Sequence, residues 1–130
     1  MAVSTEDRAA ISEAVQHYID GVRDGDAAKL RQAFHEDARM FGSLAGRRID
    51  VPIAELFAMA DGHPAKVDDS FAARIVSVDQ VGDAAAAVVE EEGYWGSVSF
   101  TDFFTLSRFG DDWRIVNKTF AHTGGEPPAT

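Results

Sequence analysis

Apolar residues in the first part of the chain recur at intervals of three and four, the spacing that places side chains on one face of a helix. Ser4 and Asp7 form the S-x-x-D pattern of a helix start, and Gly25 is a helix stop. A helix over residues 4–24 is therefore predicted. Its buried face carries Ile11, Val15, Tyr18, Ile19 and Val22.

Two shorter helices and a strand are predicted next. Asp26 is the expected N-cap of the first of these helices. Its buried residues are Leu30, Ala33 and Phe34. A short strand over residues 38–41 and a Gly-rich loop over residues 42–48 follow. Asp50 and Pro52 then predict the start of a third helix. The buried side of this helix carries Ile53, Leu56, Phe57 and Ala60.

From residue 70 onward the pattern changes to the alternation that is typical of strands. The predicted strands span 71–79, 85–94, 98–109 and 113–122. Helices that precede strands in this way indicate an α+β fold, with the helices packed on one side of an antiparallel sheet. Residues 1–123 are predicted to form a single domain, and residues 124–130 a flexible tail.

The hairpin over residues 98–122 carries an acid on its apolar face. Because side chains alternate between the two faces of a strand, the even-numbered residues of 98–106 share the interior face. These residues are Val98, Phe100, Asp102, Phe104 and Leu106. An ionised group in an apolar wall costs several kcal/mol unless it is paired and hydrogen-bonded. Asp102 is therefore expected to have a partner.

A three-residue turn at 110–112 sets the predicted register of this hairpin. The predicted pairs are Phe109 with Trp113, Phe104 with Lys118, and Asp102 with Phe120. Asp102 and Lys118 are then diagonal neighbours on one face, roughly 7–8 Å apart at the backbone. Three interpretations stay open: a structural ion pair, an anchor for a ligand, or a general acid or base at Asp102 tuned by Lys118.

Composition narrows the classes of function. The chain contains no cysteine, which excludes disulfides, thiolate catalysis and cysteine zinc sites. Its net charge of −10 argues against a nucleic-acid or anionic-membrane surface. No apolar run approaches the length of a membrane-spanning helix, and no signal peptide is recognisable, so a cytoplasmic location is expected.

Two segments resemble the nuclear transport factor 2-like superfamily. Residues 17–42, HYIDGVRDGDAAKLRQAFHEDARMFG, are similar to its opening signature. Residues 100–120, FTDFFTLSRFGDDWRIVNKTF, are similar to the subgroup of putative lumazine-binding proteins, near the SnoaL-like polyketide cyclases. The resemblance covers about residues 5–122. It implies a cone-shaped fold of three helices against a curved antiparallel sheet, with a ligand pocket between the layers.

Ketosteroid isomerase, a member of this superfamily, offers a test of activity. Its chemistry uses a tyrosine and a protonated acid to bind an oxyanion, and a carboxylate base to move a proton. Tyr18 matches the tyrosine, but the base falls at Gly42 and the acid near Thr105. We therefore reject this activity. Related dehydratases and cyclases use tyrosine, histidine and aspartate in varied places.

Three more residues are candidates for chemistry, each with a structural alternative. Tyr18 either packs with its hydroxyl hydrogen-bonded or donates to a ligand. His35 either caps the second helix or carries a proton. Arg39 either pairs with Glu36 or Asp37 or binds an anionic group.

The candidate site is assembled from these residues and from aromatic side chains. Catalytic roles are assigned to Asp102, His35 and Tyr18. Ligand-binding roles are assigned to Lys118, Arg39, Phe57, Trp95, Phe104, Phe120 and His122. Tyr94 and Met59 either line the mouth of the pocket with Phe57 and Trp95 or belong to the core. The histidines lack metal-ligand spacing, so neither a metal site nor a cofactor is expected. Glu90–Glu92 are expected to form a solvated edge.

The leading hypothesis is a protein that binds a small apolar or aromatic molecule between sheet and helices. One alternative is a cofactor-free isomerase, cyclase or dehydratase, with Asp102 or His35 as base and Tyr18 as donor. The other is a non-enzymatic homodimeric interaction module that uses the outer sheet face, including Phe103 and Ile115.

Overall fold

The computed structural model of the chain describes residues 5–128. Its first helix, α1, spans Thr5–Asp24, and the predicted face of Ile11 to Val22 is buried. Gly25 has a φ of +67°, a conformation that glycine adopts without strain, and it ends the helix as predicted. The predicted cap at Ser4 lies outside the described residues.

The second helix, α2, spans Ala27–Ala33, and the side chain of Asp26 accepts hydrogen bonds from the first turn, as predicted. The third helix, α3, spans only Ala54–Ala60. It follows Ile53, which contributes no side-chain cap. None of the described helices combines the length and the apolar character needed to span a lipid bilayer.

The segment before α3 is a hairpin where the sequence predicted a loop and a helix start. β1 spans Phe34–Leu44 and pairs antiparallel with β2, Arg47–Pro52. Ala45 and Gly46 form the turn, both with positive φ, as tight hairpins require. The predicted loop over 42–48 and the helix start at Asp50 are therefore wrong. Pro52 is tolerated because it ends an edge strand.

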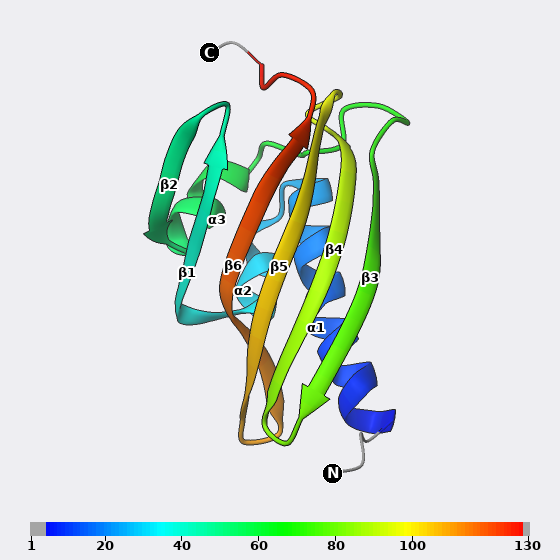
Figure 1. Cartoon of the computed structure of the whole chain (residues 1–130), viewed down its shortest axis with the longest axis vertical. Coiled ribbons are helices and arrows are strands. Elements are labelled where there is room, and N and C mark those ends of the chain that lie inside the picture. The colour runs from blue at the N-terminus through cyan, green and yellow to red at the C-terminus, as the bar shows by residue number, and fades with distance from the viewer. Residues whose placement is uncertain (1–4, 129–130) are drawn as a thin grey trace.

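Six strands form one curved sheet in the order β2–β1–β6–β5–β4–β3. The remaining strands are β3 (Ala72–Val81), β4 (Ala84–Tyr94), β5 (Val98–Phe109) and β6 (Asp112–Gly124). Neighbours pair antiparallel except β1 and β6, which are parallel. The helices lie against one face of this sheet (Figure 1). The predicted α+β architecture is confirmed.

The β5–β6 hairpin has the predicted register around Asp102 and Lys118, although its turn differs from the prediction. Its turn is shorter than predicted, so Phe109 pairs with Asp112 rather than with Trp113. Val116 has no partner in the register and forms a β-bulge, which restores the predicted alignment beyond it. The confirmed pairs are Phe104 with Lys118 and Asp102 with Phe120.

The bulge also decides which residues of β6 face the core. Ile115, before the bulge, is fully buried, so its predicted place on the outer face is wrong. The extra residue at Val116 reverses the alternation of inward and outward side chains along β6. Beyond the bulge, the even-numbered residues Lys118 and Phe120 therefore point inward. Phe103 on β5 is 52% exposed, as the outer-face prediction requires.

Candidate functional site

Four polar side chains meet in the core between α1 and three adjacent strands. Tyr18 Oη lies 2.7 Å from Asp102 Oδ2, and 3.0 and 3.2 Å from the two carboxyl oxygens of Glu91. Lys118 Nζ lies 4.0 Å from Asp102 Oδ1. We call these four residues the buried polar cluster. They come from α1, β4, β5 and β6.

Glu91 is the member of the cluster that sequence reasoning missed. The prediction that Glu90–Glu92 form a solvated edge is wrong for Glu91, which is 3% exposed, although both neighbours are exposed. Strand alternation contains the missing signal, since Glu91 shares its face of β4 with small apolar residues. These are Ala85, Ala87 and Val89.

Burial beside a second carboxyl group favours a proton on Glu91. The single hydroxyl proton of Tyr18 serves Asp102, the closer acceptor. Tyr18 also donates, over longer distances, to the two carboxyl oxygens of Glu91, and a side-chain hydrogen bond between the Glu91 and Asp102 carboxyl groups raises the pKa of Glu91. Burial raises the pKa of Glu91 well above its ordinary value, and the charge of Asp102 raises it further. The result is a hydrogen-bonded relay in which the Tyr18 hydroxyl joins the carboxyl groups of Glu91 and Asp102.

Tyr18 keeps its own proton for the same physical reason. Burial raises the pKa of its phenol well above the ordinary value, and the nearby carboxyl groups of Asp102 and Glu91 add to the effect. The rings of Tyr18 and Phe104 pack edge to face, with their centres 4.9 Å apart. Phe104, predicted to bind ligand, is thus a core residue that supports Tyr18.

Lys118 is a buried ammonium whose donors are poorly used. The 4.0 Å between Nζ and Asp102 Oδ1 is too long for a hydrogen bond, and this oxygen has no hydrogen-bond partner within residues 5–128. Nζ otherwise lies 3.7 Å from the thioether sulfur of Met40 and about 5 Å from the ring centres of Tyr18 and Phe120. Lys118 therefore retains N–H donors for another acceptor.

A small cavity of about 50 Å³ lies beside Lys118. Its wall includes three predicted ligand-binding residues, Lys118, Trp95 and Phe120, and also Met59 from α3. The other lining residues are Met40, Leu44, Ile49, Tyr94 and Phe100. We call this space the inner cavity. It places one cationic group in a wall that is otherwise mainly apolar and aromatic.

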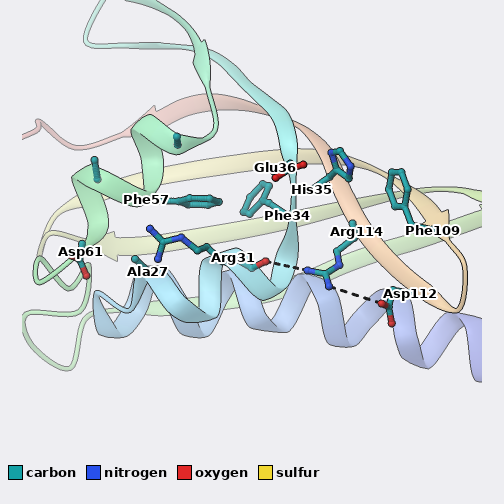
Figure 2. Close-up of a pocket in the computed structure, with 12 residues that line it drawn as sticks. Ala27, Arg31, Phe34, His35, Glu36, Phe57, Asp61, Phe109, Asp112 and Arg114 are labelled. Carbon is teal, nitrogen blue, oxygen red and sulfur yellow. Dashed lines mark hydrogen bonds and ion pairs between the residues drawn. The ribbon is translucent and has the colours of Figure 1, made fainter.

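A larger groove of about 740 Å³ lies between α2, α3 and the β5–β6 turn. It contains two predicted residues, His35 and Phe57 (Figure 2). The ring of His35 stacks on Phe109 at 4.6 Å, and its Nδ1 accepts a hydrogen bond from the Asp37 N–H. None of the buried polar cluster lines this groove. The structure therefore does not bring His35 together with Asp102 and Tyr18.

Arg39 and His122 lie outside both the inner cavity and the groove. Arg39 pairs with Asp50 across the β1–β2 hairpin at 2.9 Å, instead of with the acids that the sequence suggested. His122 Nδ1 accepts from the Ala45 N–H at 3.3 Å, and Nε2 lies 2.6 Å from the Gly125 carbonyl oxygen. A neutral ring protonated on Nε2 satisfies both contacts, so His122 links the β1–β2 turn to the residues after β6.

A family model described as "Putative lumazine-binding" matches residues 6–121, which include all four residues of the cluster. The chain belongs to the putative lumazine-binding family. The subgroup resemblance seen in residues 100–120 is thereby confirmed. A search of curated proteins found no match to the chain.

Solved structures place this member of the putative lumazine-binding family within the nuclear transport factor 2-like fold. A protein of that fold from Methylobacillus flagellatus is 32% identical, with a TM-score of 0.85, over 93% of this chain and 95% of its own. One from Shewanella baltica is 29% identical, with a TM-score of 0.84, over 96% of this chain and 100% of its own. Both of these proteins are described as being of unknown function.

A ketosteroid isomerase-like protein from Erwinia carotovora atroseptica shares the fold at 18% identity, with a TM-score of 0.70, over 94% of this chain and all of its own. At that identity the likeness concerns the fold alone. In this putative lumazine-binding family member, the position that aligned with the isomerase base has no room for a side chain. A Cβ atom at Gly42 would lie 2.5 Å from the Phe120 ring.

Proposed function

We propose that this protein binds a small, flat, aromatic molecule in the inner cavity, with Lys118 as its polar anchor. One observation carries the proposal: a buried ammonium in the cavity wall has no oxygen acceptor at hydrogen-bond distance among residues 5–128. A ligand oxygen next to Lys118 would fill that role, and charge-assisted hydrogen bonds are the strong ones. Asp102 lies behind Lys118 and balances its charge.

The walls and the family description indicate the class of ligand. The rings of Phe100 and Phe120 meet edge to face at 5.6 Å and offer apolar surface to a planar molecule. Lumazine, the compound in the family description, is a flat bicyclic heterocycle with ring carbonyls. A carbonyl oxygen of such a ring is a suitable acceptor for Lys118. This match between ring, carbonyl and ammonium supports the proposal.

Entry of the ligand requires side chains to move. The inner cavity, at about 50 Å³, has room for about one water molecule, whose share of liquid volume is about 30 Å³. Met59 is both a lining residue and 45% exposed, so it forms part of the rim. Its unbranched side chain changes rotamer at little cost. We infer that displacement of Met59 opens the cavity.

Calorimetric titration of lumazine tests the role of Lys118. The single variant K118M leaves the Asp102 charge buried and unpaired, which costs about 3–5 kcal/mol of stability. The double variant D102N/K118M removes both charges and keeps the interior neutral. We expect lumazine to bind the unmodified chain about tenfold or more tighter than the double variant, because one hydrogen bond to a charged group is lost.

The matched control is K29M, which removes a lysine charge on α2 away from the cavity. This control should bind lumazine like the unmodified chain. Equal lumazine affinity of the unmodified chain, D102N/K118M and K29M would show that Lys118 is not part of the site. An unmodified chain that binds no lumazine would exclude this ligand.

The relay of the buried polar cluster favours a second candidate function, cofactor-free proton transfer of the isomerase, cyclase or dehydratase type. Glu91 holds a proton, and Tyr18 connects it to Asp102 behind the cavity wall. The test follows the exchange of the α-protons of 1-tetralone in D₂O by NMR. Catalysis predicts faster exchange with the unmodified chain than with E91Q, whereas a purely binding protein gives equal rates.

A further inference from the structure

The proposed function leaves unused the groove between α2, α3 and the β5–β6 turn. Its volume of about 740 Å³ lies within the range of about 300–1,000 Å³ that is typical of small-molecule sites. The groove lies outside the buried polar cluster, and no residue of the inner cavity lines it.

Arg31 supplies a cationic group without an ionic partner. Its guanidinium lies over the ring of Phe57, 5.6 Å from the ring centre, and forms no ion pair within residues 5–128. In Figure 2 the side chain of Arg31 extends along the groove below Phe57. A guanidinium presents its N–H donors in a planar fork that matches a carboxylate. Arg31 is therefore available to an anionic group.

A second arginine holds the backbone of Arg31 in place. Arg114 Nη1 donates to the carbonyl oxygens of Arg31 and Gln32, at 3.1 and 3.2 Å. These carbonyls belong to the last turn of α2, where the helix leaves acceptors unused. Because the bond fixes the end of α2, Arg31 starts from an ordered position, which lowers the entropy cost of binding.

Aromatic rings line the groove on both sides of its centre. Phe34 and Phe57 meet at 5.9 Å with their planes 61° apart, and His35 stacks on Phe109 farther along (Figure 2). A planar ligand ring that packs on Phe34 and Phe57 would place its substituent next to Arg31. The groove thus combines an aromatic surface with a cation at one end.

Three acids line the groove, of which Asp112 pairs with Arg114, and one of the other two provides a decisive control. Glu36 and Asp61 are exposed lining residues, and neither pairs with Arg31. Asp61 lies at the same end of the groove as Arg31 in Figure 2. A carboxylate ligand gains affinity when Asp61 loses its charge, whereas a cationic ligand loses affinity.

From this arrangement we propose that the groove is a second binding site, specific for a small aromatic carboxylate. The carboxylate pairs with the Arg31 guanidinium, and the ring packs against Phe34 and Phe57. This site is independent of Lys118 and the inner cavity.

An NMR titration with 1-naphthoate, followed through the backbone amides, tests this proposal. The expected shifts concentrate at residues 31, 34 and 57. Loss of the Arg31 charge in R31Q should weaken binding about tenfold, as for the loss of a charge-assisted pair, and D61N should strengthen it. The matched control is R47Q, which removes an exposed arginine of the β1–β2 hairpin and should leave naphthoate affinity unchanged.

Three results would overturn the proposal: shifts that concentrate at residues 59, 95 and 118, equal affinity in R31Q and the unmodified chain, or weaker binding in D61N. The neutral analogue 1-naphthylmethanol should bind more weakly than naphthoate and respond equally little to R31Q and R47Q. D102N/K118M should bind naphthoate normally, so failure at this groove is distinguishable from failure at the inner cavity.

Discussion

Two carboxyl groups share one tyrosine hydroxyl inside this protein, and the raised pKa of Glu91 favours a negative charge on Asp102 alone. With Glu91 protonated, the remaining charges are those of Asp102 and Lys118, which sum to zero. A buried ion pair is stabilising only when its geometry and hydrogen bonds compensate for desolvation. Here Asp102 keeps one oxygen without a hydrogen bond. At the residue scale, the cluster therefore stabilises the fold less than a fully hydrogen-bonded ion pair would.

The raised pKa of Glu91 predicts a specific dependence of stability on pH. Above the ordinary pKa of 4.5 the unfolded chain releases a proton that the folded chain retains, so stability falls as pH rises. The decrease is at most about 1.4 kcal/mol per pH unit, until pH reaches the folded pKa. E91Q keeps a donor for Tyr18 and lacks this loss.

Urea unfolding of the unmodified chain and E91Q at several pH values between about 5 and 8 measures this effect. We expect the advantage of E91Q to grow with pH. A difference that stays constant with pH would show that Glu91 is ionised in the folded protein.

At the scale of elements, α1 is attached to the sheet by polar contacts at two levels. Tyr18 joins its buried face to β4 and β5 through the cluster. Near its N-terminus, Asp7 accepts from Arg108 of β5 at 2.8 Å and from Gln80 of β3 at 3.0 Å. The helix is thus held against the sheet both in the core and near the helix N-terminus.

The contact at Asp7 predicts an acid-dependent loss of stability. Hydrogen bonds from Gln80 and Arg108 lower the pKa of Asp7 below its ordinary value of 3.8. A lowered pKa gives stability that is present above the ordinary value and is lost as pH falls through the folded one. D7N should therefore lower the melting temperature near about pH 7 and have little effect near about pH 2.

Thermal unfolding at the two pH values checks the prediction for Asp7. D111N, in the exposed β5–β6 turn, is the control and should leave the melting temperature nearly unchanged at both. An equal decrease for D7N at both pH values would assign the effect to packing instead of charge.

The sequence predicts best the elements whose apolar residues recur at a regular helical or strand spacing. The buried face of α1 and the inward face of β5 follow directly from spacing, and the latter places Asp102 correctly. β2 was missed because it is a short edge strand in which only Ile49 and Val51 alternate with polar residues, and neither is fully buried. The bulge at Val116 was missed because no residue type requires it, and Ile115 was misplaced as a result.

The site was predictable only in part, for a related reason. Local pattern identified Asp102, Lys118 and Tyr18 as separate candidates, and the hairpin register related the first two. Their meeting with Glu91 depends on how α1 crosses the sheet, which local pattern does not encode. His35 was grouped with Asp102 and Tyr18 in the predicted site, but its position after α2 places it in the groove instead.

At the scale of the whole molecule, the sheet has one face covered by helices and one face uncovered (Figure 1). On the uncovered face, Phe103 is 52% exposed and lies between Val88 of β4 and Thr119 of β6. An exposed aromatic ring at the centre of a sheet is typical of an interaction surface. The homodimer expected from the sequence would use this face.

Substitution of Phe103 tests the homodimer prediction. We expect the unmodified chain to be a dimer and F103S to shift it to a monomer, measured by sedimentation equilibrium at several concentrations. F109S is a suitable control, since Phe109 is also exposed, at 42%, but lies in the groove at the β5–β6 turn. Identical masses for the unmodified chain and F103S would contradict this role.

The two tryptophans occupy different environments, and this gives the protein a built-in optical reporter. Trp95, whose backbone has a φ of +56°, lines the inner cavity. Its indole should therefore sense any molecule that enters the cavity. Trp113 is buried, with the Arg108 guanidinium 5.1 Å from its ring centre, and should report only whether the chain is folded. Fluorescence of a W113F chain would therefore isolate the cavity signal, so ligand libraries could be screened without a label.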